Sequence, residues 1–117
     1  MAEQLTAFCP YYQRAVELVG GRWTGAIIRA LLAGKLRFGE LSAAIPGMSD
    51  RMLSERLKEL EAAGIVIRTV YPATPVRIEY HLTPKGLALA AVVEAISVWA
   101  YEWLVPEEEQ GSHLTGS

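Results

Sequence analysis

The segment between residues 38 and 80 constrains the fold more than any other part of this chain. A short stretch with apolar residues at helical spacing, residues 38–45, is followed at once by a Pro-Gly pair and then by a second helical pattern. Ser49 is a favourable N-cap residue, and the acidic Asp50 after it suits the positive end of a helix. The segment therefore predicts two consecutive helices joined by a tight turn.

The second helix of this pair, which we expect to end before Gly64, has one apolar and one polar face. Its leucines recur at intervals of four and three residues, at Leu53, Leu57 and Leu60. The polar face carries Arg51, Ser54, Glu55 and Lys58. We expect the leucines to enter the core and the polar face to remain free to contact a ligand.

Two strand patterns follow the helices. Residues 65–71 are rich in β-branched side chains, and Pro72 and Pro75 stiffen the loop after them. The next strand is predicted to alternate buried Val76, Ile78, Tyr80 and Leu82 with outward Arg77, Glu79 and His81. Helix, turn, helix and β-wing, in that order, predict a winged helix-turn-helix, mainly α with a small β-wing, a class that reads DNA.

Three further helices are predicted, over residues 9–19, 24–33 and 84–104. The helix over 24–33 places Ile27 with Leu31, and Ile28 with Leu32, on buried faces, and Thr83-Pro84 begins the last helix. That helix carries an apolar stripe in which residues repeat at intervals of three and four: Leu89, Val92, Ile96, Trp99 and Trp103. We expect a second copy to cover the stripe, the alternative being that its tryptophans line an effector pocket.

Charge and composition narrow the function and the compartment. The net charge is −2, but residues 20–86 carry ten basic and six acidic side chains, so the excess of acid lies outside the predicted DNA-reading part. One cysteine, no signal-peptide pattern and no apolar run of about 20 residues predict a soluble cytoplasmic, nucleoid-associated protein without membrane contact. No catalytic, phosphate-loop or zinc-ligand motif is present, so we expect neither an enzyme nor a cofactor or metal.

The chain resembles the HxlR family of bacterial winged-helix transcriptional regulators, which are MarR-like in architecture. The motifs that carry the resemblance are Cys9-Pro10, Gly20-Gly21-Arg22-Trp23-Thr24, Arg37-Phe38, Ile45-Pro46-Gly47, Arg51-Met52-Leu53-Ser54, Leu57-Lys58-Glu59-Leu60-Glu61, Glu79-Tyr80 and Leu82-Thr83-Pro84-Lys85-Gly86.

The resemblance implies a homodimer that is joined by the helices over 9–19 and 84–104 and binds a pseudo-palindromic operator in double-stranded DNA. It also implies a response to a small-molecule or electrophile effector. It places a thiol sensor at Cys9, which has no second cysteine in its own chain. The interface residues so implied are Tyr11, Tyr12, Val92, Ile96, Trp99 and Trp103.

Within the predicted DNA-binding surface, Arg51 is the first candidate for a base contact, and Ser54, Glu55 and Lys58 are its neighbours. Arg37 and Ser49 are expected to contact phosphates, although capping or a solvated surface explains each of them equally well. Arg77, which follows the proline loop of the wing, is expected to contact a phosphate or the minor groove. Arg56 lies nearer the core face, so an ion pair is as good an explanation there as DNA.

The sequence therefore predicts one domain over residues 1–105, with the helix-turn-helix and wing over 38–82 and a disordered polar tail over 106–117. The predicted function is a sequence-specific transcriptional regulator, most simply a repressor. The competing hypothesis is a winged-helix module that binds proteins and has no sequence-specific DNA site.

Overall fold

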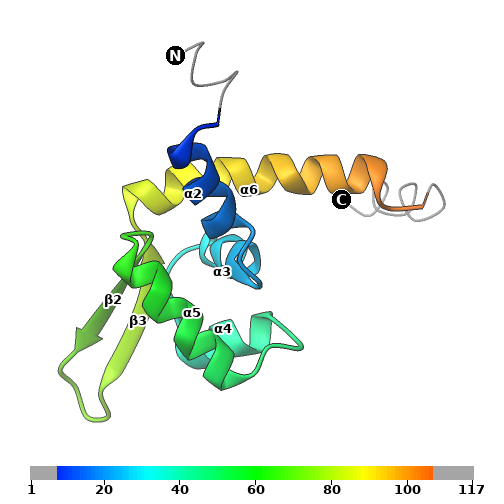
Figure 1. Cartoon of the computed structure of the whole chain (residues 1–117). Helices are drawn as coiled ribbons and strands as arrows, with labels where there is room; N and C mark the ends of the chain where they lie inside the picture. Colours follow the sequence, from blue (N-terminus) through cyan, green and yellow to red (C-terminus); the bar gives the residue numbers. More distant parts are fainter. Residues whose placement is uncertain (1–7, 107–117) are drawn as a thin grey trace.

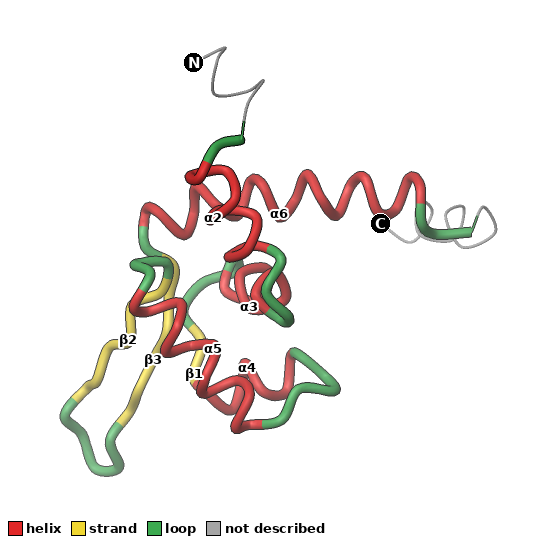
Figure 2. Tube along the Cα trace, viewed as in Figure 1, coloured by secondary structure: helices red, strands yellow, loops and turns green. Residues whose placement is uncertain are grey.

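The computed structural model describes residues 8–106 and shows a bundle of short helices with a protruding β-hairpin and one long helix (Figures 1 and 2). The predicted tail from residue 107 onward lies outside the described residues. The elements in chain order are α2 (Pro10–Val19), α3 (Thr24–Leu31), β1 (Leu36–Arg37), α4 (Phe38–Ala44), α5 (Asp50–Ala62), β2 (Val66–Tyr71), β3 (Arg77–Leu82) and α6 (Pro84–Trp103).

The sheet has three antiparallel strands in the order β1-β3-β2. β2 and β3 form the wing, from the pair Val66 and Leu82 to the pair Tyr71 and Arg77. β1 was not predicted, because a strand of two residues has no alternation to detect; only its pairing with β3, Leu36 opposite Tyr80, defines it.

The second strand of the wing, β3, begins one residue later than predicted. Val76 was expected on the buried face, but it precedes β3 and is 59% exposed. The last cross-strand pair joins Tyr71 to Arg77, so Val76 belongs to the loop beyond the ladder, where no neighbouring element covers it.

The core lies where α3, α4, α5 and the first residues of β2 meet. The predicted inner face of α5 is confirmed, since Leu53, Leu57 and Leu60 are only 1 to 2% exposed. Leu32 was wrongly predicted to be buried: α3 ends at Leu31, and Leu32 faces solvent. The most deeply buried side chains are Ile27, Ile28, Leu41, Leu53, Leu60, Ile65 and Val66.

The predicted helix starts are confirmed by hydrogen bonds. The Ser49 hydroxyl accepts the Met52 N–H at 3.1 Å, and the Thr83 hydroxyl accepts the Gly86 N–H at 3.0 Å. The Thr83 hydroxyl also donates to the Gly64 carbonyl at 2.5 Å, and Lys85 Nζ donates to the Ala63 carbonyl at 2.7 Å. The first turn of α6 therefore caps the end of α5, which fixes the direction in which α6 leaves the domain.

Helix α6 packs on α3 and β3 near its start and then extends away from the rest of the fold (Figure 1). Its buried residues are Gly86, Ala90 and Val93, and Glu94 pairs with Arg29 of α3 at 3.6 Å. Among the described helices, α6 alone has enough length and apolar character to cross a membrane by composition, with a mean hydropathy of 1.2 and 17% of that stretch buried. Lys85, Glu94 and Glu102 interrupt the apolar residues of this helix, so it is not an uninterrupted apolar run of the kind that the sequence excludes.

Candidate nucleic-acid interface

Helix α5 presents to solvent the polar face that its sequence predicts. The side chain of Arg51, one residue into the helix, is 89% exposed, and its Nε lies 3.3 Å from the Glu55 carboxylate one turn later. Exposed pairs at this spacing stabilise a helix by only about 0.3–0.5 kcal/mol. Arg51 can therefore exchange Glu55 for another acceptor at small cost. Ser54 and Lys58 lie on the same face, where Ser54 is partly exposed and Lys58 is exposed.

Arg56 is placed differently from Arg51. Its side chain is 26% exposed, and its Nη1 donates to the Glu59 carboxylate at 2.7 Å. Of the two explanations that the sequence left open for Arg56, this geometry favours the structural ion pair.

Polar groups lie at the start of α4 and at the start of α5. Ser49 uses its hydroxyl to cap α5, and Asp50 accepts a hydrogen bond from the Ser42 hydroxyl of α4 at 2.7 Å. Arg37 donates its backbone N–H to the Glu40 carboxylate at 2.8 Å, while its guanidinium has no partner among residues 8–106. The Ser49 oxygen is used to cap α5, but its O–H can still donate to a phosphate, and the Arg37 guanidinium is free among the described residues.

Arg77 stands at the base of the wing loop and is held in place. Its guanidinium carbon lies 4.6 Å from the centre of the Tyr71 ring, and its Nε lies 3.5 Å from the Glu79 carboxylate. Nearly half of its side chain is still exposed. Sequence reasoning did not single out Tyr71; the strand register places it directly opposite Arg77.

Helices α2 and α6 lie at the end of the molecule away from the tip of the wing (Figures 1 and 2). Many of their exposed side chains are apolar. On α2, Tyr11 and Tyr12 are about 70% exposed, and α2 buries no residue within one chain. In the predicted stripe of α6, every residue after Leu89 is 48 to 68% exposed, namely Val92, Ile96, Trp99 and Trp103. Apolar surfaces of this extent mark interaction sites in soluble proteins.

Trp23, just before α3, is a residue whose role the sequence did not reveal. Its backbone is left-handed, with φ of 74°, and its indole N–H is buried without a hydrogen-bond partner among the described residues. A Cβ placed on Gly47 would lie 3.5 Å from the ring, so Trp23 packs beside the turn between α4 and α5. The motif Gly21-Arg22-Trp23 was the one feature of the sequence that could have indicated a special role for Trp23.

A capped helix with a polar outer face, a preceding helix joined to it by a tight turn and an adjacent two-stranded wing together define a winged helix-turn-helix protein. The family profile described as HxlR-like helix-turn-helix matches residues 18–108. The chain belongs to the HxlR-like helix-turn-helix family and is a DNA-binding transcriptional regulator.

Similar proteins include two regulators from Bacillus subtilis (strain 168). YvaP is 54% identical over 98 residues, which are 84% of this chain and 91% of YvaP. YodB is 48% identical over 98 residues, 84% of this chain and 88% of YodB. The reduced form of YodB superposes with a TM-score of 0.74 at 47% identity, covering 83% of this chain and 95% of the YodB chain.

The redox regulator HypR is less similar to this chain in sequence than YodB but is similar in structure to the same degree. Its reduced form has a TM-score of 0.75 at 36% identity and covers 79% of this chain and 91% of the HypR chain. Oxidised HypR and diamide-treated YodB are also similar in structure to this chain, with TM-scores of 0.75 and 0.72.

Proposed function

We propose that two copies of this chain join through α2 and α6 and place their two α5 helices in successive major grooves of a pseudo-palindromic operator. The observation that carries the proposal is the division of α5 into a leucine face packed in the core and a polar face on which Arg51, Glu55 and Lys58 are exposed. A major groove about 12 Å wide admits such a helix, and half-sites about 34 Å apart fit a dimer with two-fold symmetry. The protein then acts in the cytoplasm, on the chromosome.

The proposed contacts fall into two groups. Arg51 reaches base edges from the first turn of α5, with Ser54, Glu55 and Lys58 beside it. Arg37, Ser49 and Arg77 contact phosphates and set the register of the domain on the duplex. The free guanidinium of Arg37 and the supported guanidinium of Arg77 favour these roles.

Arg51→Ala is expected to weaken operator binding about 10- to 100-fold and to relax sequence preference at one base position. The reason is that a good two-bond contact from arginine to guanine contributes about 1–3 kcal/mol of discrimination. The measurement is a footprint over the upstream region of the protein's own gene, followed by titrations of operator and mutated operator at fixed salt.

Arg37→Ala serves as the matched contrast, because a lost phosphate contact weakens binding to all sequences alike and lowers the salt dependence. Unchanged affinity and selectivity in Arg51→Ala would remove that residue from the base contacts. If the wild-type protein does not prefer its own promoter over competitor DNA, the protein-interaction module becomes the better account.

We also propose that Cys9 makes the regulator responsive to thiol oxidants. Cys9 is the N-cap of α2, where its sulfur accepts the Tyr12 N–H at 3.4 Å, and it is only partly buried. It therefore lies beside the tyrosines of the proposed dimer surface. The similarity to YodB and HypR, whose structures include diamide-treated and oxidised forms, supports the proposal.

Each chain has a single cysteine, so a disulfide must join two chains or a chain and a small thiol. With diamide, two Cys9 thiols give up two protons and two electrons to the N=N bond, which forms one disulfide and one hydrazine. Diamide is expected to change operator affinity in the wild-type protein but not in Cys9→Ser, and to produce a reducible dimer in a non-reducing gel. Serine keeps the helix cap, so folding is preserved. An equal response in Cys9→Ser would exclude the cysteine from sensing.

A further inference from the structure

The turn between α2 and α3 contains a sequence motif that the proposed DNA contacts do not use. The motif Gly20-Gly21-Arg22-Trp23-Thr24 forms this turn. The Gly20 N–H donates to the Val16 carbonyl at 2.7 Å, and a Cβ on Gly20 would lie 2.8 Å from the same oxygen. This close approach favours glycine and keeps the turn tight, which fixes where Arg22 and Trp23 lie.

Trp23 adopts a backbone conformation that its residue type disfavours. Its φ of 74° is left-handed, a region that bulky side chains rarely occupy. Strained residues of this kind gather at functional sites, where the surrounding contacts hold them. The ring has a contact on each of two sides. The guanidinium carbon of Arg22 lies 5.3 Å from the ring centre, and a Cβ on Gly47 would lie 3.5 Å from the ring. Trp23 therefore connects Arg22 to the turn before α5.

Arg22 is an exposed cation, and among residues 8–106 the Trp23 ring is the only partner of its side chain. No carboxylate in that part of the chain forms an ion pair with it. A cation–π contact restricts where the guanidinium lies but leaves its N–H groups without acceptors. Arg22 can therefore bind an anion that approaches from solvent.

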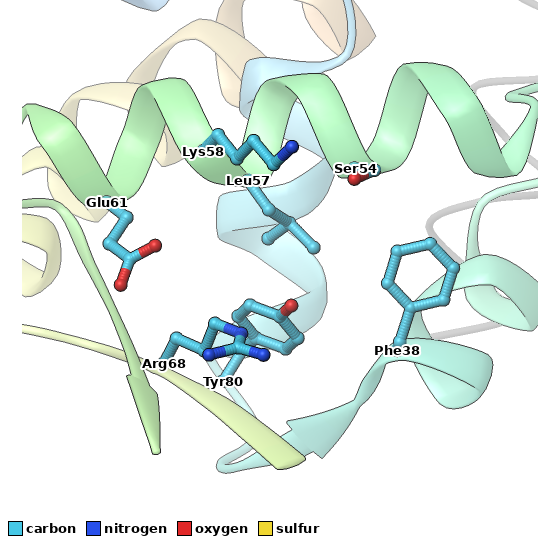
Figure 3. Close-up of a pocket in the computed structure, with 7 residues that line it drawn as sticks. All are labelled: Phe38, Ser54, Leu57, Lys58, Glu61, Arg68 and Tyr80. Carbon is cyan, nitrogen blue, oxygen red and sulfur yellow. The ribbon is translucent and has the colours of Figure 1, made fainter. Parts of the chain in front are cut away.

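The other cations around α5 lie on its wing side. Arg37 pairs with Glu79 of β3 in the strand register, and Arg77 begins β3. Figure 3 shows the pocket between α5 and the wing, whose lining includes Phe38, Leu57, Tyr80 and the cations Lys58 and Arg68. The turn between α2 and α3 lies on the side of the domain away from the wing (Figure 2). Arg22 therefore places positive charge on the side of α5 that these cations leave empty.

We propose that Arg22 contacts a DNA phosphate on the side of α5 away from the wing, and that Trp23 positions it; this inference rests on the proposed DNA-binding function. In a helix-turn-helix, the first helix crosses the DNA backbone. That helix, α4, has seven residues and is about 10 Å long. Arg37 lies at its start, and the turn that packs on Trp23 follows its end. Arg37 and Arg22 therefore contact different phosphates and hold the domain on both sides of the helix that enters the groove.

Arg22→Ala is expected to weaken binding of the operator and of a scrambled duplex by the same factor, about tenfold or more for a dimer that loses two contacts. Each lost phosphate contact lowers the slope of log affinity against log salt by about 0.9, so the slope falls by about two. The measurement is fluorescence anisotropy of both labelled duplexes over a range of salt concentrations. The matched control is Arg29→Ala, which removes a cation of α3 that pairs with Glu94 of α6 at 3.6 Å. Its salt slope is expected to equal that of the wild type.

An unchanged salt slope in Arg22→Ala overturns the contact, and so does an equal change in Arg29→Ala. A loss confined to the operator also overturns it, because a phosphate contact carries no sequence information. Light scattering after size exclusion identifies a further adverse outcome, in which Arg22→Ala is a monomer and Arg22 belongs to the dimer surface. If the wild-type protein binds neither duplex, the proposed function itself fails. If the wild type and Arg51→Ala behave as expected and Arg22→Ala equals the wild type, only the inference about Arg22 fails.

A cycle of single and double variants tests Trp23 as the positioning residue. Trp23→Leu removes the aromatic face, keeps an apolar side chain and has the same unfavourable left-handed backbone. We expect it to weaken DNA binding about fivefold or more while Arg22 is present, and less than about twofold in the Arg22→Ala background. An equal loss in both backgrounds would mean that Trp23 acts only through the turn at Gly47, and the positioning role would be wrong.

Circular dichroism on thermal unfolding shows whether Trp23→Leu is folded. If it is not, Trp23→Phe takes its place in the cycle, since phenylalanine keeps an aromatic ring but is a weaker partner for a cation than tryptophan. Its expected loss of affinity is about twofold to threefold, and this loss disappears in the Arg22→Ala background. A loss that persists there contradicts the positioning role in the same way.

Discussion

The double variant Ile96→Asp, Trp99→Asp is expected to be a folded monomer that binds the operator at least about a hundredfold more weakly than the wild-type protein. Both side chains are about half exposed in one chain, so the substitutions leave the core intact. In a dimer through α6, each substitution appears twice and places unpaired carboxylates in an apolar contact, which costs several kcal/mol. Loss of the second copy also removes the gain from binding two half-sites at once.

Two measurements test this prediction. Light scattering after size exclusion gives the mass in solution, and circular dichroism on thermal unfolding shows whether the subunit is still folded. The control is Ala91→Asp, which adds a carboxylate to an exposed position of α6 outside the stripe. Should the double variant remain a dimer, the stripe is not the interface. A monomer with full operator affinity would show that DNA binding needs only one copy.

Gly86→Ala is expected to destabilise the subunit by at least about 3 kcal/mol, and so to lower its melting temperature by about 10 °C or more. A Cβ at this position would fall well inside the van der Waals radius of the Ile65 carbonyl oxygen and also press on Leu82. That carbonyl accepts the Thr83 N–H at 3.0 Å, so it cannot move away without breaking the junction between α5 and α6.

Gly39→Ala is the matched control, because a Cβ at this helical position meets nothing within 4 Å. Alanine is the better helix former there by up to about 1 kcal/mol, so this variant is expected to be equal to the wild type or more stable. The comparison is made by urea denaturation of both variants at one pH. Equal stability of Gly86→Ala and the wild type would mean that α6 can move away from Ile65 at little cost.

Much of the architecture was predictable because the relevant forces are local. The spacing of Leu53, Leu57 and Leu60 defines a helix with a core face, and Ser49 and Thr83 mark the first residues of their helices through hydrogen bonds to N–H groups three residues on. The alternation before Leu82 likewise indicates a strand. The errors lie at element ends, where Leu32 and Val76 have the right residue type but no partner element to cover them.

The site was only partly predictable for a related reason. The exposed face of α5 follows from helical periodicity, and Arg51 could be selected from it. The support of Arg77 by Tyr71 and the combination of Phe38, Leu57 and Tyr80 into a pocket depend on strand register and on contacts between distant segments. Residue spacing along the chain carries no direct record of such contacts.

The sequence by itself determined which segments are helical, which face of each helix is apolar and which cations are left on the polar face of α5, because these follow from interactions within a few residues. Only the tertiary structure decided that β1 exists, that Trp23 packs beside the turn before α5, and that the first turn of α6 caps the end of α5. Those arrangements depend on which buried surfaces fit together, and the direction of α6, with the apolar stripe that it leaves uncovered, results from that fit.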